Sequence, residues 1–223
     1  MLKRNTLYAF ASLLFFTLLW EFSGNLLIPP PSKVIPSLFT DTTVLLKHTT
    51  ATFKEMVAGM AIATACAFPI AWGMLRFTSI KSVLEPFFVI VQCVPMFTLA
   101  PIFVLWCGWS FSAVVIPTAL MIVFPLTMNI FKGISATPQP YLEYFKVHGA
   151  TAWQEFFKLR IPFARPHIFA GLRISAAVAG TGAIAGEWAG AQEGLGVYIQ
   201  ICRRNFDLVG VFAALFCLLV LSL

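Results

Sequence analysis

PQPYLEYFKVHGATAWQEFFKLRIPFARP, residues 138–166, is a polar island between two long apolar stretches of the chain. Four basic residues lie in it, which are Lys146, Lys158, Arg160 and Arg165. Basic residues that connect membrane-spanning segments gather on the cytoplasmic side of a membrane. We therefore expect the polar island to face the cytoplasm, and the spans on either side of it to be arranged accordingly.

The polar island has the pattern of two short helices joined at a glycine. Thr137 is expected to cap the first helix, which begins with prolines whose missing N–H groups cost nothing in a first turn. Gly149 is expected to end this helix, because glycine readily takes the left-handed conformation found just after a helix.

The second short helix has a start signal of its own. Thr151, followed three residues later by Gln154, forms the pattern of a capping box. The helix is expected to run to about Arg160 and to end at Pro162. Its apolar side chains fall at helical spacing on one face, at Trp153, Phe156 and Phe157.

The composition predicts an all-α membrane protein. Hydrophobic residues make up 59% of the 223 residues and charged residues 11%, far from the average of a soluble domain. The net charge of +6 does not require a nucleic-acid partner, because the basic residues lie mostly between apolar runs. We expect one transmembrane domain over residues 1–223, held in a lipid bilayer.

About six transmembrane helices are expected. The stretch 27–36, LIPPPSKVIP, is too rich in proline for a regular helix and is predicted to be a linker into a short amphipathic helix. With the six spans given below, ten Lys and Arg residues lie on one side of the membrane and five on the other. This distribution favours a cytoplasmic position for both chain ends. The expected spans are Leu7–Trp20, Met56–Leu75, Pro86–Cys107, Phe111–Phe131, Ile168–Ala191 and Leu208–Leu223.

The last expected span is short. Residues 208–223 number sixteen, about 24 Å of helix, which is less than the thickness of a bilayer core. We expect the final helix to be truncated.

Two spans carry candidate residues for a translocation path or for helix packing. Pro95 and Pro101 are expected to kink the third span, close to Gln92, and the kink is equally compatible with a path or with a purely structural role. In the fifth span Gly182, Gly186 and Gly190 form small-xxx-small steps, which predict a close approach of two helices.

Glu187 is the acidic residue set within the fifth span. A charge facing lipid is costly, so its side chain is expected to point toward protein or a cavity. Two roles stay open for it: a carboxylate hydrogen-bonded at the rim of the membrane, or a residue of the translocation path.

The spacing of the polar island resembles the E-A-A-x3-G-x9-I-x-L-P signature of the permease subunits of type I ABC importers. The resemblance implies a cytoplasmic coupling helix that seats in a groove of a separate ATPase. Tyr144 and Phe145 replace the two alanines of the signature, which implies a partner with matching space. The matching residues are Glu143, Gly149, Leu159, Ile161 and Pro162.

Other segments also resemble this family. Pro31-Ser32 and Val34 are similar to a P-S-x-V stretch of its nitrate, sulfonate, taurine and thiamine-precursor branch. The fold implied is a core like that of the methionine permease. An E-x-x-G-x-x-x-G-L-G pattern of the family is matched by Glu187, Gly190, Gly194, Leu195 and Gly196.

The resemblance implies a subunit of an ATP-driven importer that works by alternating access in a bacterial-type plasma membrane. The implied partners are ABC ATPase subunits, a second permease copy in a homodimer or a close paralogue, and an extracytoplasmic substrate-binding protein. The implied substrate is a small organic nutrient such as a thiamine precursor, riboflavin, a sulfonate or nitrate. ATP would be used by the partner, with no cofactor bound by this chain.

Other function classes are less favoured. An autonomous secondary transporter or channel is the alternative, but it would be expected to carry charged residues at the membrane midplane, and the spans have almost none apart from Glu187. An enzyme is not expected, because the chain has neither a phosphate-binding loop motif nor an H-E-x-x-H motif. The five cysteines form no C-x-x-C pair, so no metal site is predicted.

Overall fold

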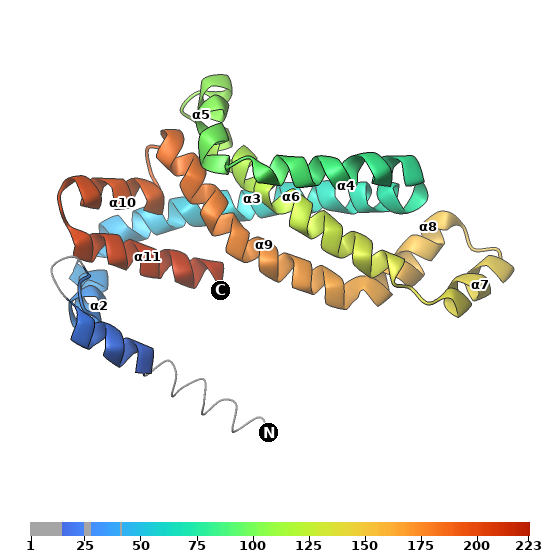
Figure 1. Cartoon of the computed structure of the whole chain (residues 1–223), viewed down its shortest axis with the longest axis horizontal. Helices are drawn as coiled ribbons and strands as arrows, with labels where there is room; N and C mark the ends of the chain where they lie inside the picture. Colours follow the sequence, from blue (N-terminus) through green and yellow to red (C-terminus); the bar gives the residue numbers. More distant parts are fainter. Residues whose placement is uncertain (1–14, 25–27, 41) are drawn as a thin grey trace.

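The computed structural model describes residues 15–24, 28–40 and 42–223, and Figure 1 shows these residues as an array of helices. The described part contains no strand, which agrees with the expected all-α class. A helical segment at residues 15–23 comes first. The later elements are α2 (Pro31–Thr40), α3 (Thr42–Arg76), α4 (Thr78–Cys93), α5 (Met96–Cys107), α6 (Phe111–Ser135), α7 (Gln139–Val147), α8 (Ala152–Glu155), the π-helical turn Phe156–Arg160, α9 (Ile161–Gly190), α10 (Leu195–Arg204) and α11 (Leu208–Ser222).

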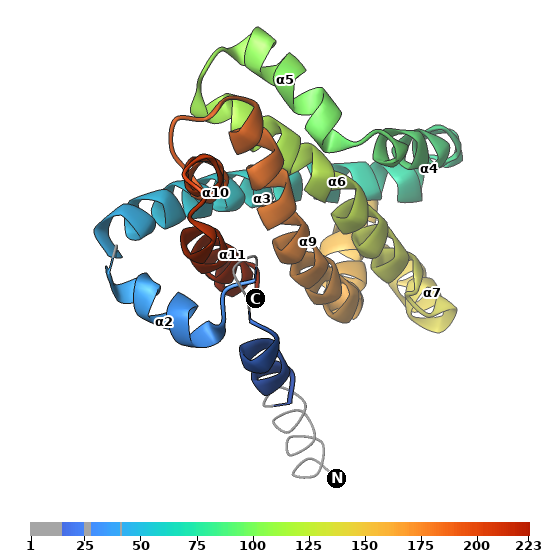
Figure 2. The same ribbon diagram turned by 60° about the vertical axis from the view of Figure 1, so that its left-hand side comes forward.

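The centre of the fold is the packing of α6 between α3 and α9, which Figures 1 and 2 show from two sides. Small residues recur every four positions on the buried face of α3 and let its backbone approach the neighbouring helices. The buried residues of this core include Ala63, Ala67 and Ala71 of α3, Ile122, Leu126 and Ile130 of α6, and Ala179 and Ala183 of α9.

Three helices of the described chain are long and apolar enough to cross a membrane, and a bent pair makes a fourth crossing if it counts as one span. The three are residues 42–76, 111–135 and 152–190, and the pair is α4 with α5. α11 is apolar but only 15 residues long. Most of the first expected span, Leu7–Trp20, lies outside the described residues, although residues 15–20 are helical.

The third expected span, Pro86–Cys107, is not one helix. α4 already begins at Thr78, with only Phe77 between it and the end of α3. The axes of α4 and α5 are bent by 95° at the break between them. The break falls at Val94, whose extended conformation (φ −84°, ψ 120°) is the one that a following proline imposes. Pro95 therefore separates two helices, whereas Pro86 and Pro101 lie inside them.

The expectation of a non-helical linker at residues 27–36 is wrong for its second half. Residue 27 lies outside the described residues, but Pro31 begins α2, which also contains Pro36. Pro31 occupies the first helical position, where a missing N–H group costs nothing. Burial of Val34 adds a tertiary contact, so packing overrides the poor helix propensity of the segment.

Pro162 does not end a helix, contrary to the sequence expectation. α8, the π-helical turn and α9 follow one another without a gap, and residues 152–190 form one helical run of 39 residues. The π-helical turn widens the helix just before Pro162, with the Ile161 N–H donating to the Phe156 carbonyl. Pro162 comes just after this widened turn, where the helix accommodates a residue without an N–H group. The second half of the polar island is thus the beginning of the fifth span.

Candidate functional site

The polar island forms the helix–turn–helix that its pattern predicts, with one difference at its start. Gly149 has φ +70° and separates α7 from α8, and Thr151 with Gln154 forms a capping box whose two hydrogen bonds measure 3.2 and 3.0 Å. Thr137 does not cap α7. Its hydroxyl group donates instead to the Ile134 carbonyl at the end of α6, and Pro138 precedes the helix.

The second half of the polar island is anchored to the membrane core. Arg160 donates from Nη1 to the Ile134 carbonyl at 2.8 Å and from Nε to Glu155 at 2.7 Å, which joins the π-helical turn to the end of α6. Phe156 is buried, with its ring centroid 6.2 Å from that of Trp72 in α3. α8 and the π-helical turn therefore contact α3 and α6 and continue directly into α9.

The first half of the polar island is turned outward. In α7, Tyr144 is 59% exposed and Val147 is 83% exposed, while the ring of Tyr144 stacks on His148 with centroids 4.1 Å apart. Glu143 is exposed and Phe145 is partly buried. This group of α7 side chains is called the coupling surface below.

The signature residues of the polar island therefore divide between two surroundings. Glu143 and Gly149 are exposed, whereas Leu159 is buried and Ile161 and Pro162 are partly buried against the rest of the chain. The apolar end of the signature is packed against the rest of the chain, and its acidic and glycine end is exposed.

The three glycines of the fifth span lie where α9 meets α6 and α5. A Cβ atom on Gly182 would lie 2.9 Å from the Thr118 Cα, and one on Gly186 would lie 2.7 Å from the Val114 Cα. On Gly190 it would lie 2.6 Å from the Val104 side chain of α5. The backbones are thus too close for any larger residue without a shift.

The candidate residues of the third span lie apart from those glycines. Gln92 and Pro95 line a hollow of about 350 Å³ at the break between α4 and α5, together with residues of α6 and Val178 of α9. Pro101 lies in α5 and is exposed. The structure does not bring Gln92, Pro95 and Glu187 into one site.

Glu187 is buried in a polar network at the end of the molecule opposite the polar island. Its exposed fraction is 2%, and its carboxyl group accepts hydrogen bonds from the Thr52 hydroxyl at 2.6 Å and from the Gly196 N–H. The Leu195 N–H in turn donates to Thr52 at 2.7 Å. Side chains of α3 and α9 thereby satisfy the free N–H groups at the start of α10.

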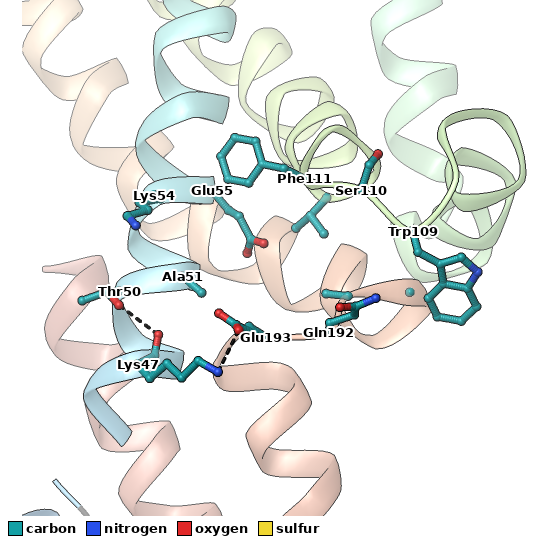
Figure 3. Close-up of a pocket in the computed structure, with 13 residues that line it drawn as sticks. Lys47, Thr50, Ala51, Lys54, Glu55, Trp109, Ser110, Phe111, Gln192 and Glu193 are labelled. Atoms are coloured by element: carbon teal, nitrogen blue, oxygen red, sulfur yellow. Dashed lines mark hydrogen bonds and ion pairs between the residues drawn. The ribbon is translucent and has the colours of Figure 1, made fainter. Parts of the chain in front are cut away.

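Beside this network lies a cavity of about 440 Å³, called the distal cavity (Figure 3). Lys47 and Glu193 form an ion pair of 2.8 Å at its mouth, where the hydrogen bond and the charge of Lys47 hold the pKa of Glu193 below its usual range. Trp109 and Phe111 line another side. Glu187 is not among the residues that line this cavity.

Glu55 contributes the buried carboxyl group of the distal cavity. Its exposed fraction is 5%, and its carboxyl group is hydrogen-bonded to that of Glu187 across the contact between α3 and α9. Figure 3 shows its carboxyl group turned toward the space between α3 and the 190–193 segment. Lys54, the preceding residue, is exposed at the edge of the same cavity.

Comparison with known proteins identifies the family. The model of the family described as "binding-protein-dependent transport system inner membrane component" matches residues 56–223. The chain belongs to this family. It is a multi-pass membrane permease of the ABC importer type, and the family implies a separate ATPase, which uses ATP, and a substrate-binding protein.

Relatives of the permease include three named transport proteins. The formylaminopyrimidine transport permease protein ThiX of Halalkalibacterium halodurans is 34% identical over 219 residues, 94% of this chain and 88% of its own. The riboflavin transport system permease protein RibX of Chloroflexus aurantiacus is 29% identical, with 81% and 67% covered. The taurine transport system permease protein TauC of Escherichia coli is 26% identical, with 78% and 66% covered.

Sequence reasoning missed the buried polar face of α3 in this permease. The expected span begins at Met56 and leaves Glu55 outside, whereas α3 is continuous through Glu55. His48 accepts a hydrogen bond from the Gly194 N–H at 3.0 Å, and Thr52 bonds Glu187. The signal was present, because His48, Thr52 and Glu55 continue backward, at helical spacing, the small-residue stripe of Gly59 and Ala63.

Proposed function

We propose that this permease forms half of a translocation path that opens alternately to the two sides of the membrane, driven by an ATPase docked on the coupling surface. The observation that carries the proposal is the continuous helical run of residues 152–190, which begins in the polar island and ends beside Glu187. A helix of this length extends about 58 Å. A movement at α8 therefore reaches the distal cavity through one continuous helical run.

The coupling surface supports docking of a separate protein. Tyr144 and Val147 leave apolar area exposed beside Glu143, on a helix that rests on the core only through Leu142 and its neighbours. Tyr144 and Phe145 are larger than the alanines of the family signature, so the partner groove must be wider at this point. Partner choice is expected to depend on these two side chains.

The proposed assembly has two permease copies, two ATPase subunits and one extracytoplasmic binding protein. One copy offers few spans to surround a path, which supports a homodimer or a pair with a close paralogue. The polar island and both chain ends are proposed to lie in the cytoplasm of a bacterial-type cell, which leaves the distal cavity on the outer side. Residues 1–223 are proposed to form one permease domain.

The proposed substrate is a small organic nutrient. The relatives named for formylaminopyrimidine and riboflavin support a nitrogen heterocycle such as a thiamine precursor, and the relative named for taurine supports a sulfonate.

The coupling assignment is tested at Gly149. Replacing it by valine (Gly149→Val) places a β-branched residue at φ +70°, a conformation that such residues avoid, and should displace α7 from α8. We expect the variant to remain in the membrane but to lose ATPase co-purification and ATP-driven uptake.

Gly108→Val is the matched control. Gly108 has φ +69° and, like Gly149, open space where a Cβ atom would lie, but it is placed between α5 and α6, away from the coupling surface. We expect this variant to retain the ATPase. Normal ATPase co-purification and uptake in the Gly149→Val variant would overturn the coupling assignment.

A further inference from the structure

The inference concerns Glu55 and rests on the proposed function of the permease. Glu55 Oε2 is buried and accepts no hydrogen bond from the residues that the structure describes. A buried acceptor without a donor is rare in a native protein and calls for an explanation. Glu187, which Glu55 contacts, is by contrast satisfied by Thr52 and Gly196.

The position of Glu55 connects this free acceptor with the distal cavity. Glu55 is one of the residues that line it, with Trp109 and Phe111 on another side. A volume of about 440 Å³ lies within the range of small-molecule sites. The cavity thus combines a carboxyl group at its buried end with aromatic side chains nearer its mouth.

The charges at the mouth do not neutralise Glu55. Lys47 is already paired with Glu193, and Lys54 is exposed at the edge. An oxyanion could approach Lys54 but would meet a carboxyl group further in, which repels it when ionised. A group with N–H donors would instead supply the hydrogen bond that Glu55 Oε2 lacks.

We propose that Glu55 is a specificity-determining residue of the permease, whose carboxyl group accepts a hydrogen bond from an amino group of the transported molecule in the distal cavity. Aminopyrimidines and aminoalkanesulfonates both carry such an amino group, so either class of molecule could donate this hydrogen bond. Small oxyanions without an N–H donor are poor ligands of this cavity.

The test uses the permease–ATPase complex in lipid nanodiscs and two pairs of probes that differ by one amino group. Taurine is compared with ethanesulfonate, and 4-amino-2-methylpyrimidine with 2-methylpyrimidine. Binding is followed by tryptophan fluorescence, because Trp109 lines the cavity. One added hydrogen bond corresponds to a preference of about fivefold for the amino member of a pair. The pair that shows the preference identifies which source of the amino group the cavity accepts.

Glu55→Leu is the decisive variant, with Glu193→Leu as its matched control in the same cavity. Leucine is close in size to glutamate but has no hydrogen-bond acceptor, and we expect the amino preference to fall below about twofold. Glu193→Leu should keep the preference, because Glu193 is paired with Lys47 at the mouth. Membrane content and ATPase co-purification show that each variant is folded.

Equal affinity for both members of each pair in the unmodified complex would overturn the proposal. An amino preference that survives in Glu55→Leu would do so as well. Neither result bears on the coupling assignment, which is tested separately by ATPase co-purification of the Gly149→Val variant. Loss of the ATPase from the unmodified permease would contradict the proposed function instead.

Discussion

At the scale of single residues, the glycines of α9 show that helix packing in this permease is limited by backbone distance. Gly186 faces the Val114 Cα of α6, and Gly182 faces the Thr118 Cα one turn away. Without a hydrophobic driving force between helices in lipid, such close contacts supply much of the association. The seam between α6 and α9 therefore depends on residues that carry no side chain.

Replacing Gly186 by alanine (Gly186→Ala) should destabilise the permease by about 1–3 kcal/mol, because a Cβ atom 2.7 Å from the Val114 Cα must push two backbones apart. Gly73→Ala is the matched control. Its Cβ atom would meet only the Ile80 side chain at 3.7 Å, and alanine stabilises a helix by about 0.5–1 kcal/mol over glycine. Thermal unfolding in detergent measures both changes. An unchanged melting temperature in Gly186→Ala would contradict the packing argument.

At the scale of elements, the link between the polar island and the core is concentrated at the π-helical turn. Its residue Arg160 reaches both Glu155 and the last turn of α6, and its two bonds are charge-assisted. The coupling surface on α7 has no comparable anchor among the described residues. In the proposed mechanism, docking on α7 and transmission of movement through α8 and the π-helical turn therefore involve different helices.

Arg160→Gln should separate these two tasks. We expect ATPase co-purification to persist, because α7 is untouched, while uptake per ATP hydrolysed falls several-fold as the α8 segment loosens from α6. Lys158→Gln, an exposed position in the same turn, should behave like the unmodified permease. The measurement is coupled uptake and ATP hydrolysis in proteoliposomes, and full coupling in Arg160→Gln would contradict the transmission role.

At the scale of the whole molecule, the two candidate sites lie at opposite ends of the helix array. Figure 1 shows α7 and α8 at one end with the connection between α3 and α4, and α10 at the other end. The family relationship makes the permease one subunit of a larger importer. The proposed direction of transport requires the distal cavity to face outward.

Sidedness can be measured with two exposed amide side chains, Gln154 in α8 and Asn205 after α10. In a background without native cysteines, Asn205→Cys should react with a membrane-impermeant maleimide on intact cells. Gln154→Cys should react only after the cells are permeabilised. Reversed labelling would contradict the orientation proposed from the distribution of Lys and Arg.

Much of this permease was determined by local sequence. The apolar runs predicted the helical class, Gly149 predicted the end of α7, and the Thr151–Gln154 pair predicted the start of α8. Gly186 predicted close packing. Each of these features depends on a few neighbouring residues. The spacing of the polar island indicated the family. These features required no knowledge of the rest of the fold.

Tertiary structure decided the rest. Packing turned residues 31–36 into helix and carried the chain through Pro162 into α9, because burial outweighs local propensity. The meeting of Glu55 with Glu187, separated by more than one hundred residues, depends on how α3 crosses α9. Local pattern could place each carboxyl group on a helix. Only the crossing of α3 and α9 gives the Glu187 carboxyl group its hydrogen bonds and leaves the Glu55 carboxyl group facing a cavity.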